Sequence, residues 1–147
     1  MPAMQFAALP FRVIEGRVEV LLVTSRETRR WVIPKGWPMR GKQPHQAAAR
    51  EAFEEAGVKG DAAPEAIGGF TYWKKLRRNR LLCTVEVFAM TVSAELKVWP
   101  ERRQRKRRWF PAAEAAEQVE EPGLAALIRD VLPAVVSKFP TPQPTLV

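Results

Sequence analysis

Hydrophobic residues alternate with polar ones, or form short apolar runs, over two stretches near the start of the chain. Residues 4–14 and 17–24 show this pattern, and the Glu15-Gly16 pair between them suits a tight turn. A shorter stretch, 31–33, is stopped by Pro34, which cannot donate to a sheet ladder. The pattern therefore predicts two long strands joined by a turn, then a basic loop and a short strand.

Further strands are predicted in the second half of the chain. Residues 66–73 and 81–92 have strand-like patterns, and LLCTVEVFAMTV at 81–92 is apolar enough to lie centrally in a sheet. The basic segment 74–80 is predicted to be the turn between them. Residues 107–110 predict an edge strand.

Three stretches have helical character. Residues 43–56 begin beside Pro44 and 111–119 are rich in alanine, whereas 124–135 carry apolar side chains at i, i+3, i+4, i+7, i+8 and i+11. Pro133 is expected to kink this last helix or end its regular part. The sequence thus contains segments with the hydrophobic periodicity of strands and segments with that of helices.

Length and composition predict one domain covering residues 1–147. Of the 147 residues, 46% are hydrophobic and 27% charged, which is enough for one core. The proline-rich segment 138–147 is expected to be a flexible tail. Cys83, the single cysteine, lies in an apolar run, which favours a core position and a reducing compartment.

The N-terminal residues do not have the pattern of a secretion signal. No apolar run approaches the roughly 20 residues that a membrane span needs. We therefore expect a cytoplasmic protein that does not enter a membrane.

Positive charge is concentrated in three clusters. The net charge is +8, and most basic residues lie within 26–42, 74–80 and 102–108. Such clusters favour a polyanionic partner. A single lysine or arginine is more often a solvated surface residue, so the prediction rests on the clusters and not on their members.

Acidic residues are crowded within the stretch 36–58, GWPMRGKQPHQAAAREAFEEAGV. On a helix, Glu51 lies one turn from Glu54 and Glu55, so the three carboxylates are expected to share one narrow sector. Like charges this close repel each other. A hard divalent cation with oxygen ligands, Mg²⁺ or alternatively Mn²⁺, would compensate them. The plainer alternative is a solvated charged face.

This stretch resembles the Nudix box, G-x5-E-x7-R-E-U-x-E-E-x-G-U, in which U is a bulky aliphatic residue. Lys42 stands where the family usually has its first Glu, and Ala52 stands where a larger aliphatic residue is preferred. The resemblance implies a Nudix-type α/β/α sandwich, an α/β fold with a mixed β-sheet between helices. The residues in register are Gly36, Arg50, Glu51, Glu54, Glu55, Gly57 and Val58.

The resemblance also implies an enzyme, a pyrophosphohydrolase that uses Mg²⁺ to cleave a phosphoanhydride bond. Glu51, Glu54 and Glu55 are then expected to bind metal, with Gly36 as an additional backbone ligand. Glu54 or Glu55 is the candidate for the indispensable residue, and Glu51 is the candidate for a metal ligand or the base. Arg50 is expected to orient Glu54 from one turn away. Bases outside the box are common in the family, and the sequence does not rank Glu86, Glu95 and Glu101.

Three runs narrow the expected substrate. The chain resembles enzymes acting on diphosphoinositol polyphosphates and diadenosine polyphosphates in three runs: RRWVIPKGWP, YWKK and RQRKRRWF. Arginine offers a bidentate fork and lysine a mobile point charge for such phosphates. The expected phosphate-binding residues are Lys35, Lys74, Lys75, Arg105 and Arg30. Trp37, Trp73 and Trp99 can stack on an adenine, although packing is the default role for each.

Other functions stay open. The substrate can be another nucleoside diphosphate derivative, and the basic segment 102–108 motivates a nucleic-acid binder, although no nucleic-acid motif is present. Lys42 is the only support for a non-catalytic domain that binds a phosphorylated ligand. We expect a small polyanionic phosphorylated substrate rather than nucleic acid. The sequence does not give the oligomeric state.

Overall fold

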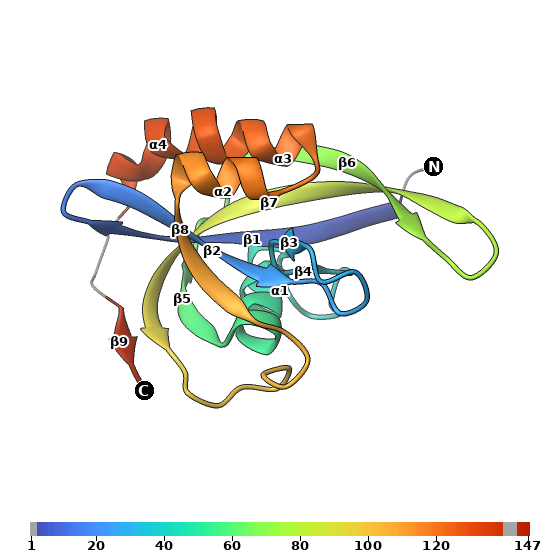
Figure 1. The fold of residues 1–147 in the computed structure, drawn as a ribbon, viewed down its shortest axis with the longest axis horizontal. Helices are drawn as coiled ribbons and strands as arrows, with labels where there is room; N and C mark the ends of the chain where they lie inside the picture. Colours follow the sequence, from blue (N-terminus) through green and yellow to red (C-terminus); the bar gives the residue numbers. More distant parts are fainter. Residues whose placement is uncertain (1–2, 140–143) are drawn as a thin grey trace.

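The computed structural model describes residues 3–139 and 144–147. These residues form one mixed β-sheet with helices on both faces (Figure 1). The strands, in chain order, are β1 (Ala3–Ile14), β2 (Arg17–Thr24), β3 (Trp31–Val32), β4 (Lys35–Gly36), β5 (Val58–Ala62), β6 (Gly68–Lys75), β7 (Arg80–Glu95), β8 (Arg107–Pro111) and β9 (Thr145–Leu146).

Strands β1 and β7 are the centre of the sheet. They pair in parallel from Ala3 opposite Cys83 to Phe11 opposite Thr91, whereas β2 pairs with β1, and β5 and β6 pair with β7, in antiparallel fashion. Glu15 and Gly16 both have positive φ in the β1–β2 turn, as the sequence predicts for a tight hairpin. Strand β8 pairs with β2 and is an edge strand of the described sheet, as predicted.

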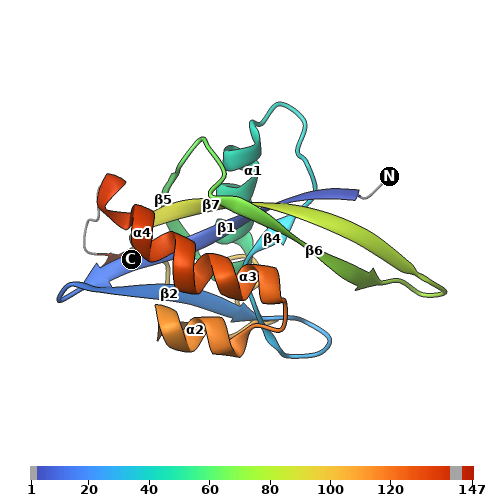
Figure 2. The ribbon, with the colours of Figure 1, turned by 90° about the horizontal axis from the view of Figure 1, so that it is seen from above.

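The helices lie in two layers. One face of the sheet carries α1, and the other carries the C-terminal helices, which Figure 2 shows from above. The predicted α/β/α sandwich is therefore confirmed. The helical segments are α1 (Pro44–Glu51), η1 (Ala52–Ala56), α2 (Ala112–Gln118), α3 (Pro122–Ala126), η2 (Leu127–Val131), α4 (Leu132–Val135) and η3 (Val136–Lys138).

The final helical run is irregular where the sequence predicts it. The amide of Leu132 donates to the carbonyl of Leu127, five residues earlier, so η2 is a π-helical turn. Pro133, which has no amide proton to donate, follows directly. The expected irregularity at Pro133 is thus present as a widened turn.

Part of the predicted C-terminal tail is a strand. Thr145 and Leu146 pair in parallel with Ala94 and Glu95 of β7. At these two residues the tail is thus extended and lengthens the sheet, and its flexibility elsewhere stays a prediction. Residues 140–143 of the predicted tail lie outside the described residues.

The sheet separates two hydrophobic clusters. The cluster under α1 and η1 includes Leu21, Phe88 and Met90 of the sheet together with small helix residues, among them Ala48, Ala52 and Ala56. The opposite cluster packs Leu9, Phe11, Leu22 and Val87 against Leu124, Ile128 and Leu132. Cys83 is buried and free, as its apolar surroundings predict. No helix in the described residues is both long enough and apolar enough to span a membrane.

The alanine at position 52, where the sequence departs from the Nudix pattern, leads to a stability prediction. Ala52 is fully buried between its helix and the sheet, so Ala52→Leu adds three carbon atoms where the surrounding side chains already pack. Overpacking of this kind costs about 1–3 kcal/mol of unfolding free energy. Urea denaturation of the variant is expected to show a lower midpoint. An unchanged or raised midpoint would show unfilled space beneath the helix.

Candidate active site

The carboxylate helix has well-defined ends. Pro44 occupies its first turn, and the Gln43 amide donates to Gln46 Oε1 at 2.8 Å, which satisfies one of the free amides at the start. The helix continues through the π-helical turn η1 and ends at Gly57, whose φ of +64° is left-handed. The helix predicted over 43–56 is confirmed.

Glu51 and Glu55 line an open cleft of about 580 Å³. The Glu51 carboxylate lies directly against Gly36 of β4, so a Cβ at position 36 would overlap it. Glu55 is only 8% exposed. Glycine is therefore required at position 36 if Glu51 is to reach the cleft in this way.

Glu54 lies beside Arg50, apart from the cleft lining. Arg50 Nη2 donates to Glu54 Oε1 at 3.4 Å, which confirms the predicted pairing of these two residues. The prediction that three carboxylates share one sector holds for Glu51 and Glu55. Glu54 does not line the cleft and pairs with Arg50, but its charge still raises the pKa of Glu51, so its place beside the pair stays a prediction.

Burial and mutual repulsion change the acidity of the cleft carboxylates. Loss of hydration, followed by the charges of Glu54 and Glu101, raises the pKa of Glu51 to about 7, although a hydrogen bond with Glu55 opposes the rise. Burial raises the pKa of Glu55 to about 8 against the opposing effect of Arg105. A hydrogen bond between two carboxyl groups requires that one of them be protonated. The pair therefore holds a proton near neutral pH.

Two cations face these carboxylates. Arg105 Nη2 lies 3.6 Å from Glu55 Oε2, while its other nitrogens donate to Glu101 Oε1 at 2.8 Å and to the Thr24 carbonyl at 3.2 Å. Lys35 lies over the Tyr72 ring, and burial lowers the pKa of its amine while Glu55 opposes that shift. Arg105, predicted to bind phosphate, is thus already engaged with carboxylates.

The β7–β8 loop (residues 96–106) and the start of β8 hold the end of the carboxylate helix. Trp99 Nε1 donates to the Glu55 carbonyl at 3.2 Å, and its ring packs on Gly57 so closely that a Cβ there would collide. The Arg107 guanidinium lies 4.0 Å from the Trp99 ring centre and donates to the carbonyls of Ala56, Gly57 and Leu96. These contacts satisfy carbonyl groups that a helix end leaves without partners.

The sequence predicted neither Trp99 nor Arg107 in this role. The sequence gives packing as the default role of Trp99, with adenine stacking as an option, and the structure shows packing, against the helix end. Arg107 belongs to a basic run in which nothing marks one arginine as different from its neighbours. Only the contact between distant segments distinguishes these two residues.

The other predicted phosphate ligands divide into two groups. Lys35, Lys74 and Lys75 line the cleft. Arg30 also lines it, but its guanidinium is bound by Glu121 at 2.7 Å and by Glu120 at 3.5 Å. The structure thus leaves the three lysines better placed than Arg30 to meet an anion in the cleft.

The structure also distinguishes among the remaining candidates for the base and for base stacking. Among the three bases left unranked, Glu101 lines the cleft, whereas Glu95 accepts from Trp109 Nε1 at 3.0 Å and Glu86 lies on β7 away from the cleft lining. Trp37 and Trp73 line the cleft and are 43% and 55% exposed. Two aromatic rings therefore lie at its rim, with the Arg80 guanidinium 4.9 Å from the centre of the Trp73 ring, over one of its faces.

The carboxylates supply a donor set suited to a hard cation. The described residues do not already gather three His, Cys, Asp or Glu side chains closely enough to hold a metal ion. However, Glu51, Glu55 and nearby Glu54 offer only oxygen donors, which Mg²⁺ prefers. The raised pKa values of Glu51 and Glu55 reflect burial first and neighbouring negative charge second, and a divalent cation would offset both by favouring the ionised carboxylates. The chemistry of these residues therefore fits such an ion.

Comparison with known proteins gives a consistent result. Residues 4–133 match the sequence profile of the NUDIX domain. The chain is 30% identical over 138 residues to "Nudix hydrolase 13, mitochondrial" of Arabidopsis thaliana, a match covering 90% of this chain and 68% of that protein. It is 38% identical over 117 residues to "Diphosphoinositol polyphosphate phosphohydrolase 3-beta" of Bos taurus, covering 78% of this chain and 67% of the relative.

The fold is also found among solved structures. A C. elegans Ap4A hydrolase binary complex is similar with a TM-score of 0.64 and 19% identity, covering 93% of this chain and 99% of the other. At this identity the likeness concerns the fold alone. Against some curated relatives the matched part is shorter, and the chain spans 47% of "Nudix hydrolase 4" of Arabidopsis thaliana.

The raised pKa of Glu55 predicts an unusual pH dependence of stability. A carboxyl that titrates near 8 when folded and near 4.5 when unfolded keeps its proton in the folded state only, so rising pH favours unfolding between these values. In EDTA, the melting temperature is expected to fall between about pH 5 and pH 8. The fall should be smaller in Glu55→Gln, by roughly 5 °C. Parallel melting curves for the two proteins would contradict the assignment.

Proposed function

The chain belongs to the Nudix hydrolase family, and from that premise we propose a Mg²⁺-dependent enzyme that cleaves a phosphoanhydride bond in a polyphosphorylated substrate. The proposed substrates are diadenosine polyphosphates or diphosphoinositol polyphosphates. The observation that carries the proposal is the cleft itself, where Glu51 and Glu55 face the lysines Lys35, Lys74 and Lys75. Acidic and basic groups thus meet in one cavity.

This division of charge suits the proposed reaction. Mg²⁺, when bound, would neutralise charge on the phosphoryl oxygens and lower the pKa of a water. Glu51, Glu54 and Glu55, with the Gly36 carbonyl, are the proposed ligands, and Arg50 orients Glu54. Lys35, Lys74 and Lys75 bind the phosphates that do not react.

Glu101 is the proposed base outside the box. It lines the cleft beside Glu51 and Glu55, and two contacts fix its position: its amide donates to the Glu54 carbonyl at 3.0 Å, and its carboxylate accepts from Arg105. A base must reach the attacking water directly. Glu86 and Glu95 do not line the cleft, which supports Glu101 over both.

The exposed tryptophans favour the dinucleotide over the inositol substrate. Trp37 and Trp73 are exposed at the rim, with Arg80 over one face of the Trp73 ring, and an aromatic face binds a nucleobase by stacking, whereas an inositol ring has no π-system. We therefore place diadenosine polyphosphates first.

The alternatives have less support. Lys42, the reason to consider a non-catalytic domain, lies exposed in the turn that follows Met39 and does not line the cleft. Its charge therefore does not replace a carboxylate within the cleft. Nucleic-acid binding is supported by basic residues alone.

The central test is metal-dependent turnover. The purified chain with Mg²⁺ should hydrolyse a compound in a panel of dinucleoside polyphosphates, inositol pyrophosphates, nucleotide sugars and nucleoside triphosphates. Glu54→Gln removes a proposed ligand charge and should lower kcat by at least about a hundredfold. Glu65→Gln, which neutralises an exposed carboxylate elsewhere, is the matched control. An undiminished rate in Glu54→Gln would refute the mechanism.

Substitution of Trp73 separates the two substrate classes. Loss of one stacking face costs about 1–3 kcal/mol of base binding, so Trp73→Leu should raise KM for a diadenosine polyphosphate roughly tenfold. KM for a diphosphoinositol polyphosphate should change little, and Trp73→Phe should restore most of the dinucleotide affinity. Steady-state kinetics that show equal effects on both substrates would remove the stacking role.

A further inference from the structure

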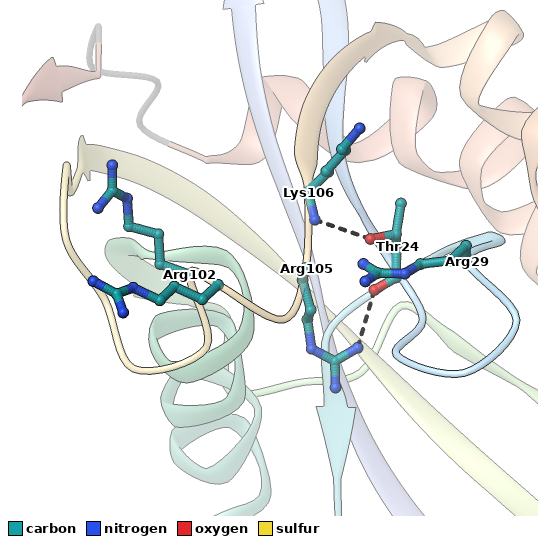
Figure 3. Close-up of a pocket in the computed structure, with 6 residues that line it drawn as sticks. Thr24, Arg29, Arg102, Arg105 and Lys106 are labelled. Atoms are coloured by element: carbon teal, nitrogen blue, oxygen red, sulfur yellow. Dashed lines mark hydrogen bonds between the residues drawn. The ribbon is translucent and has the colours of Figure 1, made fainter.

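A second pocket lies beside the cleft and is lined almost entirely by cations. It has a volume of about 600 Å³ and is formed by Thr24, Arg29, Arg102, Arg103, Arg105 and Lys106 (Figure 3). The size is within the range of small-molecule sites, about 300–1,000 Å³. No carboxylate and no aromatic ring is among the lining residues. The pocket is therefore distinct in character from the cleft, which contains both.

The pocket is built by two loops that are tied together. Arg29, in the β2–β3 loop (residues 25–30), donates from Nη1 to the Gln104 carbonyl at 3.0 Å, and Arg26 donates to Gln104 Oε1 at 3.2 Å. On the same side, the Lys106 amide donates to Thr24 Oγ1 at 2.9 Å (Figure 3). These bonds hold the β2–β3 loop against the β7–β8 loop, so the walls are fixed in the absence of a ligand.

Arg29 also adopts a backbone conformation that its residue type disfavours. Its φ is +58°, in the left-handed region, where a long side chain is uncommon. The conformation is maintained by the Arg29 amide, which donates to the Ser25 carbonyl at 3.1 Å, and by the Ser25–Thr28 hydroxyl contact at 2.6 Å. Strained residues of this kind concentrate at functional sites. Here the strain places a guanidinium on the pocket wall.

The positive charge of the pocket is largely uncompensated. Of its cations, Arg105 is paired with Glu55 and Glu101. Within the described part of the chain, Arg29, Arg102, Arg103 and Lys106 have no carboxylate at ion-pair distance, and Arg102, Arg103 and Lys106 are exposed. Like charges on two adjoining loops without counter-charges raise the local concentration of anions and favour an anionic ligand.

We propose that this pocket binds a chain of phosphate groups, as a second anion site that adjoins the carboxylate cleft and shares Arg105 with it. The unpaired cations are spread along the pocket, with Arg102 and Lys106 pointing away from Arg29 (Figure 3), so they match a row of phosphates rather than one, and arginine forks bind phosphate in a bidentate manner. A nucleic-acid strand is less suitable, because binding of single strands relies on aromatic stacking that the lining lacks. The phosphate chain can belong to the substrate or to a free polyphosphate. The site is defined by binding, so it does not depend on the hydrolysis proposed above.

The test compares two variants with the same loss of charge. One carries Arg102→Gln, Arg103→Gln and Lys106→Gln, and the other carries Arg40→Gln, Arg77→Gln and Arg78→Gln, which are exposed residues outside both cavities. Calorimetric titration with inorganic tripolyphosphate, in EDTA and low salt, should show at least about tenfold weaker binding in the first variant and less than about twofold in the second. Thermal melting confirms that each variant is folded.

Equal losses of tripolyphosphate affinity in both variants would show that net charge alone causes the binding, and would overturn the site. Undiminished binding in the first variant would also overturn it. Tighter binding of a short oligouridylate than of tripolyphosphate, with the same dependence on these three residues, would overturn it in favour of nucleic acid. Kinetics then identify the source of the phosphates. A KM that rises only for long phosphate chains indicates the substrate, whereas loss of a rate response to added tripolyphosphate indicates a free effector. If no substrate is turned over, the calorimetric comparison still decides whether this pocket binds phosphate chains.

Discussion

The site depends on two carboxylates that lie side by side, Glu55 buried and Glu51 half-buried. Both lose hydration and share a proton near neutral pH, and a buried charge left without a partner costs several kcal/mol. Arg105 compensates from the β7–β8 loop, and Lys35 compensates from β4. Because these cations come from distant segments, the acidic pair is stable only when the sheet, the helix and the loop are assembled together.

The same assembly explains how the helix is positioned. Its alanine face allows close approach to the sheet, and Arg107 and Trp99 hold the backbone at its C-terminal end. Neither the alanine packing nor the contacts of Arg107 and Trp99 use an acidic side chain, so the acidic side chains remain free to face the cleft. The π-helical turn η1 lies in this held region, as such turns often do at functional sites.

Local patterns made much of this fold predictable. The alternating strands, the apolar spacing around Leu124 and Ile128, and the Glu51–Glu55 stretch all depend on residues close in sequence. Other features depend on contacts between distant segments: β5 is short and polar and pairs with β7, and β9 is stabilised by pairing with Ala94. Spacing also could not show that Arg30 and Arg105 are occupied by glutamates while Lys74 lines the cleft.

The two loops that adjoin β7 differ in what they permit. The turn between β6 and β7, residues 76–79, is exposed at the end of a hairpin that projects beyond the helices (Figure 1), so added residues there extend into solvent. The β7–β8 loop has a fixed span, because Trp99 must reach Gly57 while Arg107 reaches Ala56 and Leu96. Insertions should therefore accumulate in the hairpin turn among descendants of this sequence, whereas the loop that holds the carboxylate helix should keep its length.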